Sequence, residues 1–145
     1  GDVYKRQGDI DDEDVAESVL AMLLRNGLTP VFCAITHDRQ GQLLNCNADS
    51  VAAAVACAAS RIHPASLIYC FEKPGVLSDA DDDNSVISLI TPENYASLRE
   101  SGAVSGGMIP KIDNALSAIS RGVKSVTIKS AADLLEPTAG TVIKA

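Results

Sequence analysis

The stretch Asp49–Phe71, with the sequence DSVAAAVACAASRIHPASLIYCF, decides the fold class, because it predicts a helix followed directly by a strand. Its first part, as far as Ile62, is rich in alanine, which favours a helix and leaves small side chains for close packing. His63-Pro64 ends this helix, since proline disfavours helical backbone in the residue before it. Ser66–Phe71 is then apolar without alternation, a pattern typical of a strand buried on both faces, as in a parallel sheet.

Helices and strands alternate on both sides of this stretch. We expect helices from Val15 to Gly27, from Thr91 to Gly102 and from Gly107 to Gly122, and strands at Pro30–Ile35, Lys124–Lys129 and Thr141–Ile143. The polar segment His37–Gln42 is expected to be a loop or hairpin turn. Strands separated by helices predict an α/β fold: a mainly parallel sheet with helices on both faces.

Composition excludes several classes of protein. The chain has 145 residues with 12 basic and 19 acidic side chains, a net charge of −7, and 46% hydrophobic residues. This is enough apolar material for a core and argues against intrinsic disorder. The acidic balance and the 3% aromatic content argue against a nucleic-acid partner. No apolar run approaches the roughly 18 residues of a membrane helix. Because the N-terminal residues are polar and acidic, we expect a cytoplasmic protein without a membrane partner.

Two clusters of potential metal ligands are better explained without a metal. Five of the six residues in Asp9–Asp14 are acidic, and we expect them to be the solvated start of the following helix. The four cysteines, at positions 33, 46, 57 and 70, contain no C-x-x-C pair, and three of them lie in apolar segments. We expect reduced core cysteines rather than a zinc site with His37 and His63, and no bound metal held by the protein alone.

Three polar segments are candidates for chemistry. In Gly41–Asp49, GQLLNCNAD, Asn45 and Asn47 offer donors and acceptors beside Asp49, although simple helix capping by Asn47 or Asp49 is the favoured explanation of this segment taken alone.

The other two candidates are SGGMIPK at Ser105–Lys111 and EKPGVL at Glu72–Leu77. Two glycines before a helix leave backbone N–H groups for an anion, and Lys111 could reach the same anion; a flexible loop with a solvated lysine is the alternative. Glu72–Leu77 follows a predicted strand, where ligands of α/β sheets collect, but could also be a plain turn. Neither the P-loop motif nor the G-x-G-x-x-G motif occurs.

Taken in order, five segments of the chain resemble the amino-acid kinase superfamily, and within it the N-acetylglutamate kinases of arginine biosynthesis. They are GQLLNCNAD at 41–49, PGVL at 74–77, LITPE at 89–93, SGGMIPK at 105–111 and GVKSV at 122–126. The resemblance implies a three-layer α/β sandwich. It also implies ATP-dependent phosphorylation, with Mg²⁺, of the γ-carboxylate of N-acetyl-L-glutamate or another N-acyl-glutamate.

The resemblance also implies roles for individual residues. Lys111 would neutralise the transferring phosphoryl group and Asp49 would hold the catalytic lysines, while Asn45 and Asn47 would bind the acyl-glutamate. The nucleotide would be bound by Glu72, Lys73, Gly75, Val76, Leu77, Ala103, Val104, Ser105, Gly106 and Gly107. Relatives usually show a Thr-Asp turn where this chain has Tyr69–Lys73, which is two residues longer, and Glu72 would replace the aspartate.

Family members are about twice this size, and the resemblance covers their C-terminal portion. We therefore expect a foreign or disordered lead-in at 1–7, the last part of an acyl-glutamate-binding domain at 8–61 and a nucleotide-binding domain at 62–145. The family's N-terminal half supplies a lysine, a Gly-Gly pair and an arginine that have no counterpart here. We expect the chain alone to be inactive and the full-length protein to be a homo-oligomer. Three alternatives stay open: a kinase with another acceptor, a non-catalytic nucleotide-binding module, and a purely structural domain.

Overall fold

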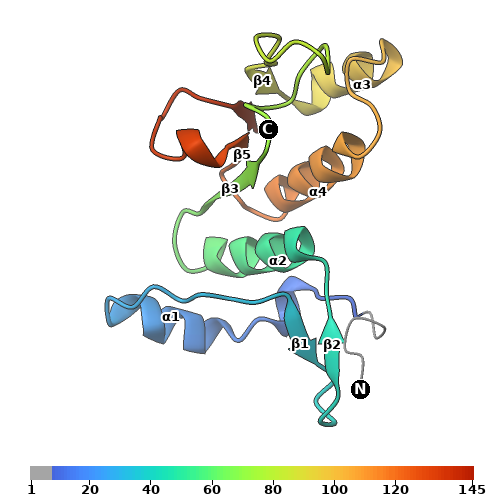
Figure 1. The fold of residues 1–145 in the computed structure, drawn as a ribbon. Helices are drawn as coiled ribbons and strands as arrows, with labels where there is room; N and C mark the ends of the chain where they lie inside the picture. Colours follow the sequence, from blue (N-terminus) through green and yellow to red (C-terminus); the bar gives the residue numbers. More distant parts are fainter. Residues whose placement is uncertain (1–7) are drawn as a thin grey trace.

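The computed structural model describes residues 8–145. Its elements, in chain order, are η2 (Asp12–Asp14), α1 (Glu17–Arg25), β1 (Ile35–His37), β2 (Leu43–Asn45), α2 (Ala48–Ser60), β3 (Ser66–Phe71), β4 (Leu89–Ile90), α3 (Pro92–Glu100), α4 (Met108–Ser120), β5 (Ser125–Ser130), η3 (Ala131–Asp133) and β6 (Thr141–Ile143). They form two lobes, with α2 lying between them (Figure 1). The predicted lead-in at residues 1–7 lies outside the described residues.

The larger lobe contains a four-stranded sheet in the order β3-β5-β6-β4. The pairs β3–β5 and β4–β6 are parallel, and β5–β6 is antiparallel. Helices α2, α3 and α4 contribute to the apolar core beside this sheet, in which Ile112, Val126 and Ile128 are fully buried. The mostly parallel α/β architecture predicted from the sequence is confirmed.

The smaller lobe contains α1 and the antiparallel hairpin of β1 and β2, with His37 paired to Leu43 at its end. The predicted turn at His37–Gln42 is confirmed, and Gly41 adopts a φ of +91° in it. The two-residue strand β4 was not predicted, because two apolar residues before a helix carry no periodicity.

The predicted buried strand at Pro30–Ile35 is wrong. Only Ile35 belongs to a strand, and Val31 is 93% exposed. Within residues 8–145 no strand pairs with 30–34, and the one backbone hydrogen bond to this run is from the Cys46 amide to the Ala34 carbonyl, so the run forms no ladder.

Two of the predicted core cysteines are also exposed. Cys33 lies in the same uncovered run, and Cys70 points away from the core on β3, which is an edge strand. Cys46 and Cys57 are buried. Because alternate residues of an edge strand face solvent, an apolar run is not enough to bury every residue in it.

The predicted acidic start of the first helix is wrong as well. Asp12–Asp14 form a separate 3₁₀ turn, and α1 begins only at Glu17. The Asp12 carboxylate accepts hydrogen bonds from Arg61 and Arg121, which follow the last residues of α2 and α4. Contacts between distant elements therefore hold these acids away from the helix that they precede in the sequence.

Candidate functional site

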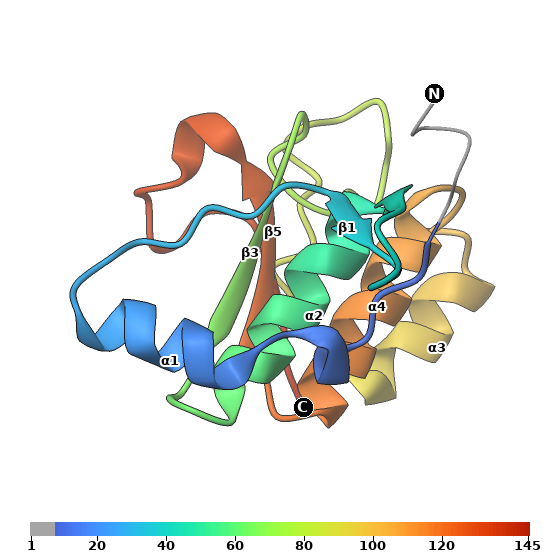
Figure 2. The same cartoon turned by 90° about the horizontal axis from the view of Figure 1, so that it is seen from below.

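The first turns of α2 and α4 bring a carboxylate and an ammonium group together. The two helices lie side by side (Figures 1 and 2), and Lys111 Nζ donates a hydrogen bond to Asp49 Oδ2. These side chains are 24% and 30% exposed. A partly buried ion pair joining residues 62 positions apart requires both helix starts to be placed accurately.

Asn47 fixes the start of α2. Its Oδ1 accepts hydrogen bonds from the backbone N–H groups of Asp49, at 2.9 Å, and Ser50, at 3.2 Å. This is the N-cap interaction, which satisfies amides that have no partner within the helix. The capping alternative therefore holds for Asn47, while the carboxylate of Asp49 is left for Lys111.

Two aromatic side chains of β3 surround the ion pair. Lys111 Nζ lies 5.5 Å from the ring centroid of Tyr69 and 5.8 Å from that of Phe71. The Tyr69 hydroxyl donates a hydrogen bond of 3.1 Å to the backbone carbonyl of Asp49. Burial, with a smaller effect from the charge of Asp49, raises the pKa of Tyr69 to about 12. The hydroxyl therefore stays protonated and remains a donor at any physiological pH.

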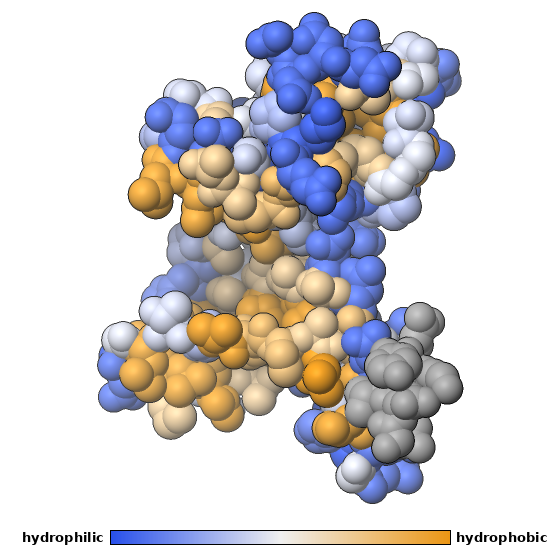
Figure 3. Space-filling view, in the orientation of Figure 1, coloured by the Kyte–Doolittle hydropathy of each residue, from blue (hydrophilic) through white to orange (hydrophobic). Residues whose placement is uncertain are grey.

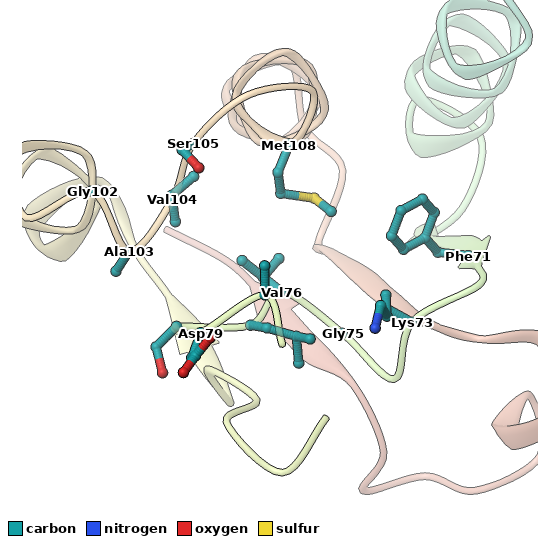
Figure 4. Close-up of a pocket in the computed structure, with 13 residues that line it drawn as sticks. Phe71, Lys73, Gly75, Val76, Asp79, Gly102, Ala103, Val104, Ser105 and Met108 are labelled. Atoms are coloured by element: carbon teal, nitrogen blue, oxygen red, sulfur yellow. The ribbon is translucent and has the colours of Figure 1, made fainter. Parts of the chain in front are cut away.

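A cavity of about 470 Å³, drawn in Figure 4, shares Phe71 with this cluster. One wall comes from the segment after β3 and the other from the turn between α3 and α4. Figure 4 shows Phe71 and Lys73 on one side, Gly102 to Ser105 on the other, and Val76 and Met108 between them. The complete lining is Phe71, Lys73, Gly75, Val76, Leu77, Ser78, Asp79, Ala80, Gly102, Ala103, Val104, Ser105 and Met108.

This cavity brings together most of the predicted nucleotide-binding residues. Those that line it are Lys73, Gly75, Val76, Leu77, Ala103, Val104 and Ser105. Glu72, Gly106 and Gly107 do not line it, although each is adjacent in sequence to a residue that does. Lys73 Nζ donates to Asp83 Oδ1 at 2.9 Å, and this hydrogen bond raises the pKa of Lys73.

The glycine turn before α4 is less open than the sequence predicts. The amides of Met108 and Ile109 donate to the carbonyls of Ser105 and Gly106, both at 3.3 Å. Pro110 has no N–H. Gly106 adopts a φ of +56°, which disfavours a side chain there. The amides of Met108 and Ile109 are thus engaged within the turn, and Lys111 adds a positive charge at this end of α4.

Thr141, which sequence reasoning missed, holds the PGVL segment in place. This fully buried residue of β6 accepts a hydrogen bond of 2.8 Å at Oγ1 from the amide of Val76. A Cβ on Gly75 would come within 2.9 Å of the same oxygen, so this position has no room for a side chain. Tyr69 and Phe71 were also missed as site residues. No local pattern identifies them, because each contact joins residues far apart in the chain.

Asn45, the other predicted substrate residue, ends β2 and lies two residues before the cap of α2. Its carbonyl accepts a hydrogen bond of 3.1 Å from Gly8, and it does not line the cavity.

In the part of the chain that the structure describes, no three His, Cys, Asp or Glu side chains form a group able to hold a metal ion. None of the described helices has the length and apolar character needed to span a membrane.

Comparison with known proteins identifies the same family as the order of the sequence motifs does. Residues 1–130 match the model of the amino acid kinase family. The chain is 47% identical over 141 residues to the acetylglutamate kinase of Phocaeicola vulgatus, and 45% identical over 133 residues to that of Cytophaga hutchinsonii. These matches cover 97% and 92% of the chain but only 54% and 50% of the relatives, so the chain spans about half of their length.

A solved structure from Streptococcus mutans UA159 has a similar fold. It superposes with a TM-score of 0.72 at 27% identity, over 99% of this chain and 58% of that protein. The match of the family model to most of the chain, together with these similarities, assigns the protein: the chain belongs to the amino acid kinase family.

Proposed function

We propose that this chain is the C-terminal portion of an acetylglutamate kinase, with the last part of the acyl-glutamate-binding domain at 8–61 and the nucleotide-binding domain at 62–145. The reaction transfers the γ-phosphoryl group of ATP to the γ-carboxylate of N-acetyl-L-glutamate, giving an acyl phosphate and ADP. The observation that carries the proposal is the Lys111–Asp49 ion pair beside a cavity that is lined by the PGVL and Ala103–Ser105 segments. The 47% identity to an acetylglutamate kinase supports this acceptor.

Phosphoryl transfer depends on alignment and on neutralising charge at the transferring group. Lys111 supplies a positive charge at the start of α4, and Asp49 keeps that charge in place between turnovers. The cavity is lined by apolar side chains and glycines together with a few polar side chains, a combination that suits the base, ribose and phosphates of a nucleotide.

Mg²⁺ would neutralise the phosphates when it is bound with ATP. This ion keeps several water ligands and is commonly held by substrate phosphates with one or two carboxylates. Such binding needs no complete cage of protein ligands. Asp79 lines the cavity and is one carboxylate available for this purpose.

The acceptor would lie on the side of β2 and the start of α2. Asn47 Oδ1 already accepts hydrogen bonds from two backbone amides, so only its Nδ2 group remains to contact a substrate. That group is a donor, and so suits the carboxylate and acyl oxygens of an N-acyl-glutamate. Asn45 is two residues away and would complete this set.

The chain spans about half of its relatives, so we propose that turnover needs the other half and that nucleotide binding does not. Titrating the 145-residue chain with Mg-ATP should shift the backbone NMR signals of residues 73–79 and 102–108 and leave those of β1 and β2 unchanged. Release of ADP in the presence of N-acetylglutamate should be undetectable. If millimolar Mg-ATP moves none of these signals, the proposed nucleotide site is wrong.

A further inference from the structure

Two of the chain's five aromatic side chains, Tyr69 and Phe71, lie against one ammonium group. They are two residues apart on β3 and therefore project from the same side of the strand. Both ring centroids lie within the roughly 6 Å at which a cation is attracted to an aromatic face. Lys111 is thus contacted by rings as well as by a carboxylate.

Tyr69 contacts both members of the ion pair. Its ring faces the ammonium of Lys111, and its hydroxyl donates to the carbonyl of Asp49. The residue is only 6% exposed. It connects the first turn of α4 to the first turn of α2 through a rigid side chain that has only two rotatable bonds.

Filling the core does not by itself explain this arrangement. Tyr95 is equally buried, at 7% exposed, but its hydroxyl donates to Asp113 at 2.8 Å and to the Ile109 carbonyl at 3.4 Å, and neither bond is to Lys111 or Asp49. An ion pair exposed by about a quarter on each side gains little from its charges alone and leaves a long lysine mobile. The two rings cover part of Lys111 and restrict where its ammonium can go.

We propose that Tyr69 is a positioning residue, which holds Lys111 and Asp49 in register beside the nucleotide cavity, with Phe71 as the second ring. This inference rests on the proposed function, in which Lys111 neutralises the transferred phosphoryl group. Phe71 lines the cavity and also lies against Lys111, so it connects the two parts of the site. Neither residue needs to touch the reacting atoms.

The test is NMR spectroscopy of the full 145-residue chain with isotope-labelled lysine, and Lys111→Arg assigns the signal. Ring currents from Tyr69 and Phe71 should move the Lys111 Hε signals upfield of those of the other lysines and split them into two. This measurement on the unchanged protein is decisive by itself. Lys111 signals that coincide with those of solvent-exposed lysines would overturn the proposal.

Variants separate the ring from the hydroxyl. Tyr69→Leu should remove most of the upfield displacement and merge the two Hε signals, whereas Tyr69→Phe should restore the displacement. Phe71→Leu should remove part of it. Tyr95→Phe, the matched control, should leave the Lys111 signals unchanged. An unaltered spectrum in Tyr69→Leu would contradict the positioning role. If that variant does not fold, Tyr69→Phe, Phe71→Leu and the unchanged chain still decide.

Mg-ATP titration distinguishes failure of this inference from failure of the proposed function. Tyr95→Phe should bind Mg-ATP within about twofold of the unchanged chain, because Tyr95 does not line the cavity. If the Lys111 Hε signals are displaced upfield and split but the chain binds no Mg-ATP, the proposed function alone is refuted. Mg-ATP binding without that displacement would refute only the role of Tyr69.

Discussion

At the scale of single residues, the hydrogen bond between Thr141 and Val76 gives a direct test of how the cavity wall is held. Thr141→Val leaves the buried amide of Val76 without an acceptor, which should lower the free energy of unfolding by about 1–3 kcal/mol. Urea denaturation measures the loss. Thr141→Ser keeps the hydroxyl, and so should lose less; equal losses in the two variants would show that the hydroxyl is unimportant.

The lowered pKa of Asp12 predicts how the free energy of unfolding depends on pH. Its hydrogen bond with Arg61 is the main reason that the pKa of its carboxyl falls from 3.8 to about 2. Because folding lowers this pKa, the Asp12 carboxylate contributes its full stabilisation above the ordinary pKa of 3.8. That contribution is lost as the pH falls from about 4 towards 2. Asp12→Asn should reduce this loss by about 1 kcal/mol, seen as a flatter curve of unfolding free energy against pH. Identical slopes for both proteins would contradict the assignment.

At the scale of the elements, the glycines at the two ends of α4 should respond oppositely to alanine. Gly122 has a φ of +106°, and a Cβ there would lie 3.2 Å from Ser60 Oγ. Gly107 has a φ of −67° and open space around it. Gly122→Ala should therefore lower the free energy of unfolding by about 1 kcal/mol or more, and with it the melting temperature. Gly107→Ala should leave the free energy of unfolding unchanged or raise it by up to about 1 kcal/mol. Calorimetry of the pair checks both signs.

The elements also show what the sequence can and cannot predict. Glycine and proline signals placed α3 and α4 correctly, because a cap acts within one turn of its own helix. Pro30–Ile35 failed because burial of a strand is decided by neighbours that its own residues do not specify. Lys111 and Asp49 were paired through the family resemblance. Tyr69 and Thr141 were not identified, because their partners lie 20 and 65 positions away.

At the scale of the whole molecule, the smaller lobe has a wide apolar surface (Figure 3). Val31, Phe32, Ile35 and Leu43 are all about half exposed or more, and a groove of about 420 Å³ runs between Phe32 and α2. A patch of this kind on an isolated chain favours association. We expect the chain to bind apolar dyes and to self-associate, as measured by sedimentation.

Val31→Asp combined with Phe32→Asp should reduce this association. Leu135→Asp is the matched control, since Leu135 is also 93% exposed but lies in the segment that follows η3, in the larger lobe. Only the first variant should move the sedimentation profile towards monomer. An equal effect of the control would show that general surface hydrophobicity, and not this patch, causes association.

Asp49 engages different neighbours through its amide, its carbonyl and its carboxylate: Asn47, Tyr69 and Lys111. A residue inserted or deleted within α2, or within β3 before Tyr69, would break at least one of these contacts, because it would rotate one end of α2 or reverse the facing of β3. Evolution and protein engineering alike should therefore find that these two elements accept substitutions but resist any change in length.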